Sequence, residues 1–217
     1  MTKSSSKKAT IAYHHGNLRE TLIEKGLEIL REEGPEGMSL REVARRSGVS
    51  QAAPYRHFQS KEDLYAAIAE LGFKTLKAML LDAARQHPED ALARVRFCGE
   101  QYFRFAREYS EHFRCMFGDY WRFDPAQSAA CEVSLEALGV FVEHVIAAQH
   151  AGQIDTTQNP MHLSIFLWSS IHGYASLYVR NSLFFIEDES LKTNELLNDI
   201  LDRTLRSAQT FNVVTHQ

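Results

Sequence analysis

The sequence of 217 residues has few cysteines and prolines and no long apolar run. Its three cysteines, Cys98, Cys115 and Cys131, are odd in number and far apart, and no Cys-x-x-Cys pair occurs. This pattern argues against a disulfide framework or a zinc finger and is typical of a cytoplasmic protein. No stretch of about 18 apolar residues occurs, so we expect no transmembrane helix and no membrane partner. The basic N-terminus is not followed by an apolar segment, so we expect no secretory signal.

The sequence also lacks the spacings that metal sites and catalytic sites need. None of the ten histidines has another histidine four residues away, so no pair of metal ligands is placed on one face of a helix. A nucleophile formed by Cys115 and a histidine is conceivable, but no neighbouring motif supports it. We therefore predict no metal, no cofactor and no catalytic residues.

Alternating strand patterns and internal repeats are absent, and apolar residues recur at helical spacing instead. The sequence therefore predicts an all-α fold. Helices are expected at about 15–33, 39–46, 50–58, 61–81, 88–108, 131–151, 160–181 and 191–208, with a short helix around 113–117 and a loop at 118–128.

Residues 39–61 form the most informative segment. Ser39 and Glu42 have the Ser-x-x-Glu spacing of a capping box, which starts a helix at Leu40. Gly48 can adopt the positive φ that ends this helix sharply, and Ser50 can cap a second helix that reaches residue 58. Two short helices joined by such a turn indicate a helix-turn-helix, whose second helix lies in the DNA major groove.

The same segment resembles the DNA-binding signature of TetR-type transcriptional regulators. The resemblance covers about residues 13–71 and depends on Gly48-Val49-Ser50, Tyr55-Arg56-His57-Phe58 and Ser60-Lys61. It implies an N-terminal three-helix DNA-binding head, joined by a long helix to an all-helical body that binds a ligand and dimerises. It further implies a double-stranded DNA operator, a small-molecule effector and a homodimer.

Several residues of the second helix can contact DNA. Gln51 can pair with adenine, and the Ala52 methyl group can meet a thymine methyl group. Tyr55 and His57 can contact phosphate and sugar, although packing within the head is an alternative, and Arg56 can reach a base or a phosphate. The candidate DNA-binding residues are Ser39, Arg41, Ser50, Gln51, Ala52, Tyr55, Arg56, His57 and Lys61.

Pro54 is unusual within this second helix. It lacks the N–H that would bond to the Ser50 carbonyl, so a tight first turn of 3₁₀ type is expected. Lys61 follows a helix start, where backbone N–H groups and its own charge both favour a phosphate. Phe58 is interpreted as a core residue.

Charge is distributed unevenly along the chain. Residues 1–61 contain 11 Lys and Arg against 7 Asp and Glu, whereas residues 62–217 contain 13 against 21, within a net charge of −4. The basic part suits phosphate binding. Lys7 and Lys8 can follow the DNA backbone or enter the minor groove, and a solvated tail is the alternative.

The C-terminal part contains a Trp168-Ser-Ser-Ile-His172-Gly173 segment. It resembles the Trp/His-Gly motif of one branch of TetR-type C-terminal domains. His172 can contact a ligand or be a hydrogen-bonded core residue. Aromatic residues also gather between positions 102 and 123, where they can form a core or the wall of a pocket. The candidate ligand-binding residues are Tyr102, Phe103, Phe117, Trp121, Trp168 and His172.

Dimerisation is expected through 160–181 and 191–208, where Ser169, Gly173 and Ser176 form a stripe of small residues and leucines of the last helix add apolar area. We predict a disordered basic arm at 1–12, a helix-turn-helix domain at 13–60 and a ligand-binding and dimerisation domain at 61–217. The leading interpretation is a ligand-responsive repressor that a small molecule releases from a palindromic operator. An activator, a regulator that responds to a protein, and a helical enzyme with an accessory DNA-binding head are the alternatives.

Overall fold

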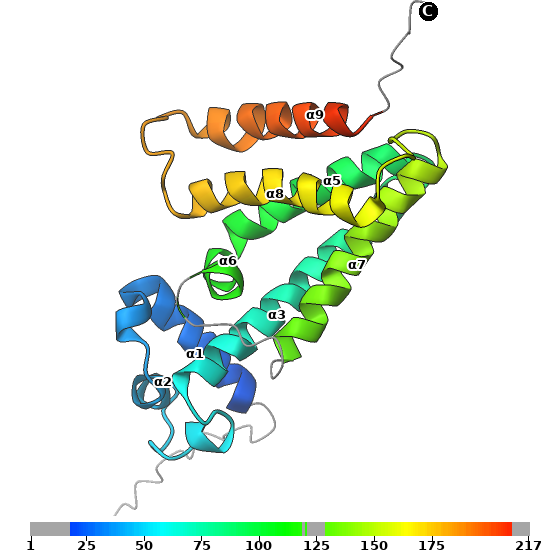
Figure 1. The fold of residues 1–217 in the computed structure, drawn as a ribbon. Helices are drawn as coiled ribbons and strands as arrows, with labels where there is room; N and C mark the ends of the chain where they lie inside the picture. Colours follow the sequence, from blue (N-terminus) through cyan, green and yellow to red (C-terminus); the bar gives the residue numbers. More distant parts are fainter. Residues whose placement is uncertain (1–17, 119, 121–128, 210–217) are drawn as a thin grey trace, which may run out of the picture. The chain divides into compact units, whose positions relative to one another are not determined.

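The computed structural model describes residues 18–118, 120 and 129–209, and Figure 1 shows its helices. The described residues form helices, turns and connecting segments without a β-strand, as the sequence predicts. Contacts between Cα atoms divide the chain into two compact units, residues 1–64 and 65–217. Among the described helices, none combines the length and the apolar content needed to cross a bilayer.

The first unit packs short helices around a small apolar core. Its elements are α1 (Leu18–Glu33), the 3₁₀ turn η1 (Pro35–Gly37), α2 (Leu40–Arg46), the 3₁₀ turn η2 (Pro54–Arg56) and the start of α3 (Lys61–Leu81). Ser39 caps α2 as predicted, because its Oγ accepts a hydrogen bond from the Glu42 N–H at 3.1 Å. Leu22, Val43 and Phe58 are fully or almost fully buried in this core, so the interpretation of Phe58 as a core residue is confirmed.

The second unit is built around α5. Its elements are the rest of α3, α4 (Ala83–Gln86), α5 (Ala91–Glu108), α6 (Ser110–Phe117), α7 (Ala129–His150), α8 (Pro160–Val179), the π-helical turn η3 (Leu191–Glu195) and α9 (Leu196–Ala208). Helix α5 packs against α4, α6, α7, α8 and α9. At Gly99 of α5, an added Cβ would lie 2.5 Å from a Leu201 methyl group of α9. The absence of a side chain at Gly99 therefore allows these two helices to approach closely.

Helix boundaries agree with the sequence predictions to within a few residues, with local exceptions. Helix α5 starts at Ala91 rather than at Pro88. Asp90 caps it, because Asp90 Oδ1 accepts a hydrogen bond from the Ala93 N–H at 3.0 Å. Pro160 is at the start of α8 as expected. Gly152 has a φ of +68° after the end of α7, a conformation typical of a residue that terminates a helix.

Three leucines of the last helix are not available for the role in dimerisation that the sequence suggested. Leu197, Leu201 and Leu205 of α9 are less than 10% exposed and face the core of their own unit. They cannot supply apolar area to a dimer interface, because the protomer has already buried them. The outward face of α9 contains charged side chains, among them Asp199, Asp202 and Arg203.

Candidate functional site

A sharp turn ends α2 and leads into the segment expected to read DNA. Gly48 has a φ of +67°. Its N–H bonds to the Arg45 carbonyl at 3.2 Å, and the Val49 N–H bonds to the Ala44 carbonyl at 3.1 Å. These two bonds form the Schellman motif, which satisfies the last carbonyls of a helix and needs a residue tolerant of positive φ. The role predicted for Gly48 is therefore confirmed.

The segment after this turn is not the α-helix that the sequence predicted over 50–58. Residues 51–53 form turns, and η2 at Pro54–Arg56 is a 3₁₀ turn. The Ser50 carbonyl accepts from the Ala53 N–H at 2.9 Å, which is the i to i+3 bond of a 3₁₀ turn. Pro54 has no N–H to offer that carbonyl, so the tight first turn continues and Ser50 caps no α-helix.

The polar side chains of this segment are exposed, while Pro54 and Phe58 are buried. Tyr55 is 52% exposed. Pro54 is almost fully buried, and Phe58 is 3% exposed with the Arg19 guanidinium 5.6 Å from its ring centroid. The alternative that Tyr55 and His57 pack inside the head therefore finds no support. The exposed candidates are Ser39, Arg41, Ser50, Gln51, Ala52, Tyr55, Arg56, His57 and Lys61.

Two arginines of α2 form ion pairs with acidic side chains. The Glu42 carboxylate accepts from Arg45 at 2.6 Å and from Arg46 at 3.0 Å, and these bonds lower its pKa to about 2. Arg46 also pairs with Glu32 and Glu33 at the end of α1. By contrast, Arg41, Arg56 and Lys61 make no ion pair within the residues that the structure describes, which leaves their charges available for phosphates.

The start of α3 places Lys61 at a capped helix end. Ser60 Oγ accepts from the Asp63 N–H at 3.3 Å, and Asp63 Oδ2 accepts from the Gln59 N–H at 2.8 Å. This reciprocal pair resembles a capping box and fixes the first turn of the helix. Lys61 is exposed in that turn, where a phosphate would meet both its ammonium group and the helix N-terminus.

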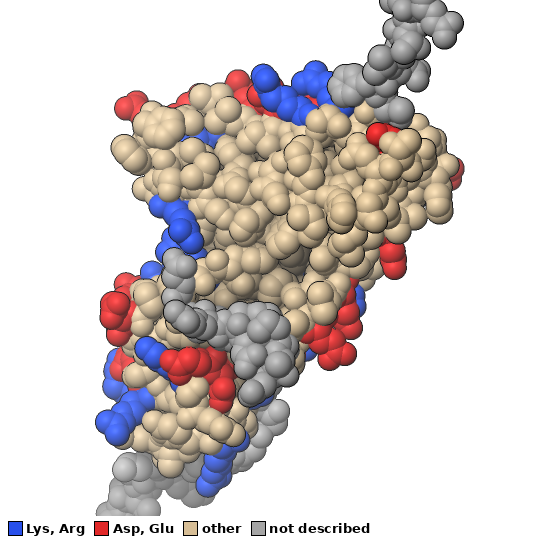
Figure 2. Space-filling view, in the orientation of Figure 1, with Lys and Arg blue, Asp and Glu red and all other residues tan. Residues whose placement is uncertain are grey.

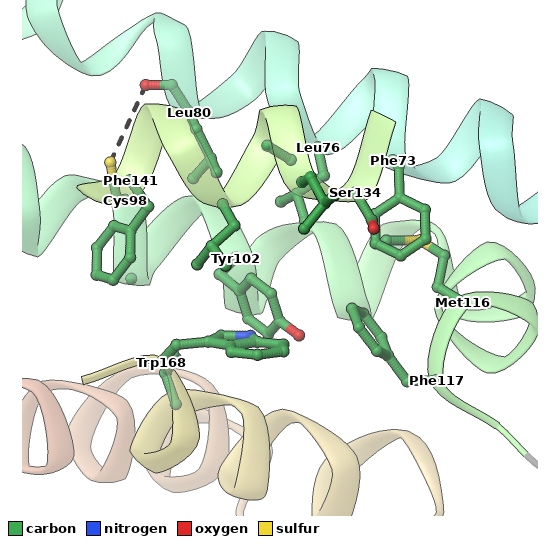
Figure 3. Close-up of a pocket in the computed structure, with 15 residues that line it drawn as sticks. Phe73, Leu76, Leu80, Cys98, Tyr102, Met116, Phe117, Ser134, Phe141 and Trp168 are labelled. Carbon is green, nitrogen blue, oxygen red and sulfur yellow. Dashed lines mark hydrogen bonds between the residues drawn. The ribbon is translucent and has the colours of Figure 1, made fainter. Parts of the chain in front are cut away.

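A cavity of about 370 Å³ lies within the second unit. Its size falls at the lower end of the range of about 300–1,000 Å³ found for small-molecule sites. Figure 3 shows side chains from several helices pointing into it. The lining residues are Phe73, Leu76 and Leu80 of α3; Cys98, Gly99 and Tyr102 of α5; Met116 and Phe117 of α6; Ser134, Leu135, Ala137, Leu138 and Phe141 of α7; and Trp168 and Ile171 of α8.

Two successive hydrogen bonds fix the position of the Tyr102 hydroxyl in this wall. Tyr102 Oη lies 2.7 Å from His172 Nδ1, and His172 Nε2 lies 3.3 Å from Ser176 Oγ. Burial raises the pKa of Tyr102 well above its usual range, so the hydroxyl stays protonated. Burial also lowers the pKa of His172, and the Arg180 charge acts in the same direction, which favours a neutral imidazole.

Three of the six predicted ligand-binding residues line the cavity, namely Tyr102, Phe117 and Trp168. His172 does not line it but supports Tyr102 from outside, so the alternative of a hydrogen-bonded core histidine is the one that the structure favours. Phe103 is not among the wall residues of this cavity and packs on Tyr174 instead, with ring centroids 5.3 Å apart. Trp121, Lys7 and Lys8 lie outside the described residues.

Wall residues from α3 and α7 were missed by the sequence analysis. Phe73, Leu76 and Phe141 belong to apolar helix faces, and a core residue has the same helical spacing as a cavity residue. Only the packing of several helices distinguishes the two, so no local signal was available for them.

Comparison with known proteins identifies the family. Residues 22–68 match the family described as "Bacterial regulatory proteins, tetR family", and residues 95–204, about half of the chain, match "Tetracyclin repressor-like, C-terminal domain". The chain belongs to the TetR family. It is therefore a transcriptional regulator with a helix-turn-helix, and membership of this family decides against the alternative of a helical enzyme.

Curated relatives of this TetR-family regulator match parts of it. The "HTH-type transcriptional activator FasR" of Mycolicibacterium smegmatis is 29% identical over 55% of this chain and 54% of its own length. The "HTH-type transcriptional regulator AcrR" of Shigella flexneri is 31% identical over 36% of each chain. The "Tetracycline repressor protein class C" of Escherichia coli is 46% identical over 24% of each chain. The regulator thus spans about half or less of the length of these relatives.

Solved structures share the fold over most of the chain. A protein of unknown function from Rhodococcus sp. RHA1 is 29% identical, with a TM-score of 0.77, over 93% of this chain and all of that one. The TetR family transcriptional regulator PfmR from Thermus thermophilus is 20% identical, with a TM-score of 0.66, over 85% of this chain and 97% of that one. The all-α fold expected from the sequence is therefore that of known TetR-family structures.

Proposed function

We propose that this TetR-family regulator is a cytoplasmic repressor, which binds a palindromic operator as a homodimer and is released from it by a small molecule. The main support is the exposure of polar side chains in residues 50–58, which we call the recognition segment. Gln51, Tyr55, Arg56 and His57 are exposed around η2, and Lys61 is exposed at the capped start of α3. The Gln51 amide can read a base edge in a DNA groove. The Arg56 and Lys61 charges and the Tyr55 hydroxyl can contact the flanking phosphates.

The outward face of α8 supports the homodimer. Ile165, Phe166 and Leu177 are 38–49% exposed on it, although large apolar side chains are usually buried. An added Cβ at Gly173 would meet no atom within 4 Å, so a partner helix has room to approach there. In Figure 2 the area over α8 shows few Lys, Arg, Asp or Glu side chains. An apolar face with a small residue at its centre suits a two-fold contact between identical helices.

Helix α3 supports the response to a ligand. It is one continuous helix that begins at Lys61 and contributes Phe73, Leu76 and Leu80 to the cavity wall. A ligand that biases the position of these three side chains therefore acts on the helix that contains the proposed phosphate contact. In this proposal residues 13–60 bind DNA, and residues 61–217 bind the ligand and dimerise.

The DNA-binding role can be tested by the salt dependence of operator affinity. If Lys61 contacts a phosphate, Lys61→Ala should weaken binding to all sequences and lower the slope of log K against log salt by about 1. Lys74→Ala is the matched control, because Lys74 is on the same helix and pairs with Glu70 at 2.6 Å. Equal salt slopes for the two variants would contradict the phosphate contact. Gln51→Ala should relax preference at one base pair, at a cost of about 1–3 kcal/mol.

Release by a small molecule can be tested by linkage. An effector that lowers operator affinity must bind the free protein more tightly than the DNA-bound protein, by the same factor. A differential affinity of tenfold, about 1.4 kcal/mol, already gives a tenfold change in DNA binding. Identical effector affinity with and without operator would refute the mechanism, even if the effector occupies the cavity.

Activation is the second candidate function, because the relative with the longest match among those described above is named a transcriptional activator. A reporter gene behind the operator distinguishes the two. Deletion of the regulator should raise expression if it represses and lower expression if it activates.

A further inference from the structure

The wall of the cavity in the second unit is almost entirely carbon. Among the residues that the structure describes, no Asp, Glu, Lys or Arg lines it. Its polar side-chain atoms are the Tyr102 and Ser134 hydroxyls, the Cys98 thiol and the Trp168 indole N–H. Burying an ionised group without a charged partner is strongly unfavourable, so this wall discriminates against ligands that carry a charge into it.

Two of these polar groups, the Ser134 hydroxyl and the Cys98 thiol, already lie against backbone carbonyls. Ser134 Oγ donates to the Cys131 carbonyl at 2.7 Å, and Cys98 Sγ lies 4.0 Å from the Leu80 carbonyl. Burial raises the pKa of the Cys98 thiol to about 12. The thiol therefore stays protonated, and it is neither an anion for a cationic ligand nor an efficient nucleophile.

Tyr102 is the polar group best placed to orient a ligand. Figure 3 shows its hydroxyl between the Trp168 and Phe117 side chains. A neutral imidazole at His172 can accept a hydrogen bond from Tyr102 Oη through Nδ1 or donate one to it, because Ser176 Oγ at Nε2 can fill either complementary role. Tyr102 can therefore accept a hydrogen bond from a ligand hydroxyl or donate one to a ligand carbonyl, and no net charge is required.

The exposure of the wall residues indicates where the cavity opens. Leu135 is 63% exposed, and Phe117, Ser134, Leu138, Phe141 and Trp168 are partly exposed, whereas the wall residues of α3 and α5 are buried. A ligand that enters beside Leu135 thus reaches Tyr102 and the buried wall residues of α3.

We infer that the effector site selects an uncharged, largely apolar molecule with one hydroxyl or carbonyl group, and that it excludes the corresponding carboxylates and ammonium ions. This inference depends on the proposed function for its regulatory meaning, because it names the chemical class of the proposed effector. The binding preference itself needs no DNA.

The test compares probes that differ only in charge. Calorimetric titration of the 217-residue chain without DNA would use 1-decanol, decanoate and decylammonium, and, for a rigid shape, 2-naphthol and 2-naphthoate. The neutral member of each series should bind at least tenfold more tightly than its charged relatives. A charged probe that binds as well as its neutral counterpart would overturn the inference, and so would a failure of all five probes to bind.

A positive charge placed at the mouth should shift the preference toward the carboxylate. Ser134→Lys adds a cation beside the cavity, and the affinity for decanoate relative to decanol should rise at least tenfold. Ala78→Lys adds the same charge at an exposed position of α3 outside the wall and should leave the ratio unchanged. Leu138→Lys replaces Ser134→Lys if circular dichroism shows that the latter is unfolded. An unchanged ratio in a folded mouth variant would place the probes outside this cavity.

The same probes separate this inference from the proposed function. If decanol or 2-naphthol binds selectively but operator affinity does not change, the site has the inferred preference and the proposed ligand response is wrong. If a carboxylate binds selectively and releases DNA, the proposed response stands and the inferred ligand class is wrong.

Discussion

The hydroxyl oxygen of Tyr102 lies 2.7 Å from Nδ1 of His172, so a residue outside the cavity positions a polar group of its wall. His172 follows Trp168 by one helical turn of α8, and their ring centroids are 5.6 Å apart. The Trp168 to Gly173 segment thus supplies a wall residue, the partner of Tyr102 and an open glycine on the outward face. This explains in physical terms why these residue types occur together.

Removal of the Tyr102 hydroxyl should destabilise the protein. Tyr102→Phe leaves the half-buried His172 Nδ1 without its partner, and we expect the free energy of unfolding to fall by about 1 kcal/mol. Urea denaturation of the full chain measures the change. Tyr109→Phe is the control, because Tyr109 is 38% exposed and exposed substitutions usually change stability by less than about 0.5 kcal/mol. Equal losses in both variants would show that the hydrogen bond to His172 contributes nothing specific.

Stability should decrease as the pH falls from 7.5 to 5.5. Burial lowers the pKa of both His144 and His172, so the unfolded chain takes up protons first, near pH 6.5. The unfolded state then binds more protons than the folded state, and the free energy of unfolding falls with pH until the folded-state pKa is passed. His172→Gln should reduce this slope, whereas His150→Gln, at an exposed position, should leave it unchanged. A slope that His172→Gln does not alter would contradict the neutral imidazole.

Much of the head could be predicted from local rules. The capping pair of Ser39 and Glu42 and the positive φ of Gly48 need only neighbouring residues, and the structure has both. The α-helix expected over 50–58 is not formed. Pro54 lacks the N–H that would bond to the Ser50 carbonyl, and a 3₁₀ hydrogen bond from the Ala53 N–H takes its place. The side-chain directions after Pro54 depend on this change and could not be read from a helical pattern.

The body was less predictable, because its site depends on packing between distant helices. Tyr102 and Trp168 were found through an aromatic cluster and a motif, but Phe103 shares the same cluster and stacks on Tyr174 instead. Adjacent positions on α5 point to different neighbours, and the sequence contains no sign of which neighbour is present. The resemblance to the Trp/His-Gly branch stays a prediction.

Replacement of Pro54 should change the recognition segment. Pro54→Ala restores an N–H that can bond to the Ser50 carbonyl, and alanine is favoured over proline in a helix interior by about 3 kcal/mol. We therefore expect more protection of residues 51–58 in hydrogen exchange and a changed base preference, because Tyr55 and Arg56 would point in new directions. Pro35→Ala, in the other 3₁₀ turn, should change neither. If exchange at 51–58 stays as fast as in the wild type, the missing N–H is not what prevents an α-helix there.

A bulky side chain at Gly173 should dissociate the proposed homodimer. An added Cβ meets nothing within 4 Å at either Gly173 of α8 or Gly139 of α7, so both sites have room for the first atom of a side chain in the protomer. Leucine is also favoured over glycine in helices by about 0.8–1 kcal/mol, so neither substitution should unfold its helix. Gly173→Leu nevertheless places a side chain where a partner α8 is expected, and it should raise the dimer dissociation constant at least tenfold in sedimentation equilibrium. Gly139→Leu should leave that constant unchanged. A wild-type monomer at micromolar concentration, or an equally dimeric Gly173→Leu variant, would show that the open face of α8 is not the dimer interface.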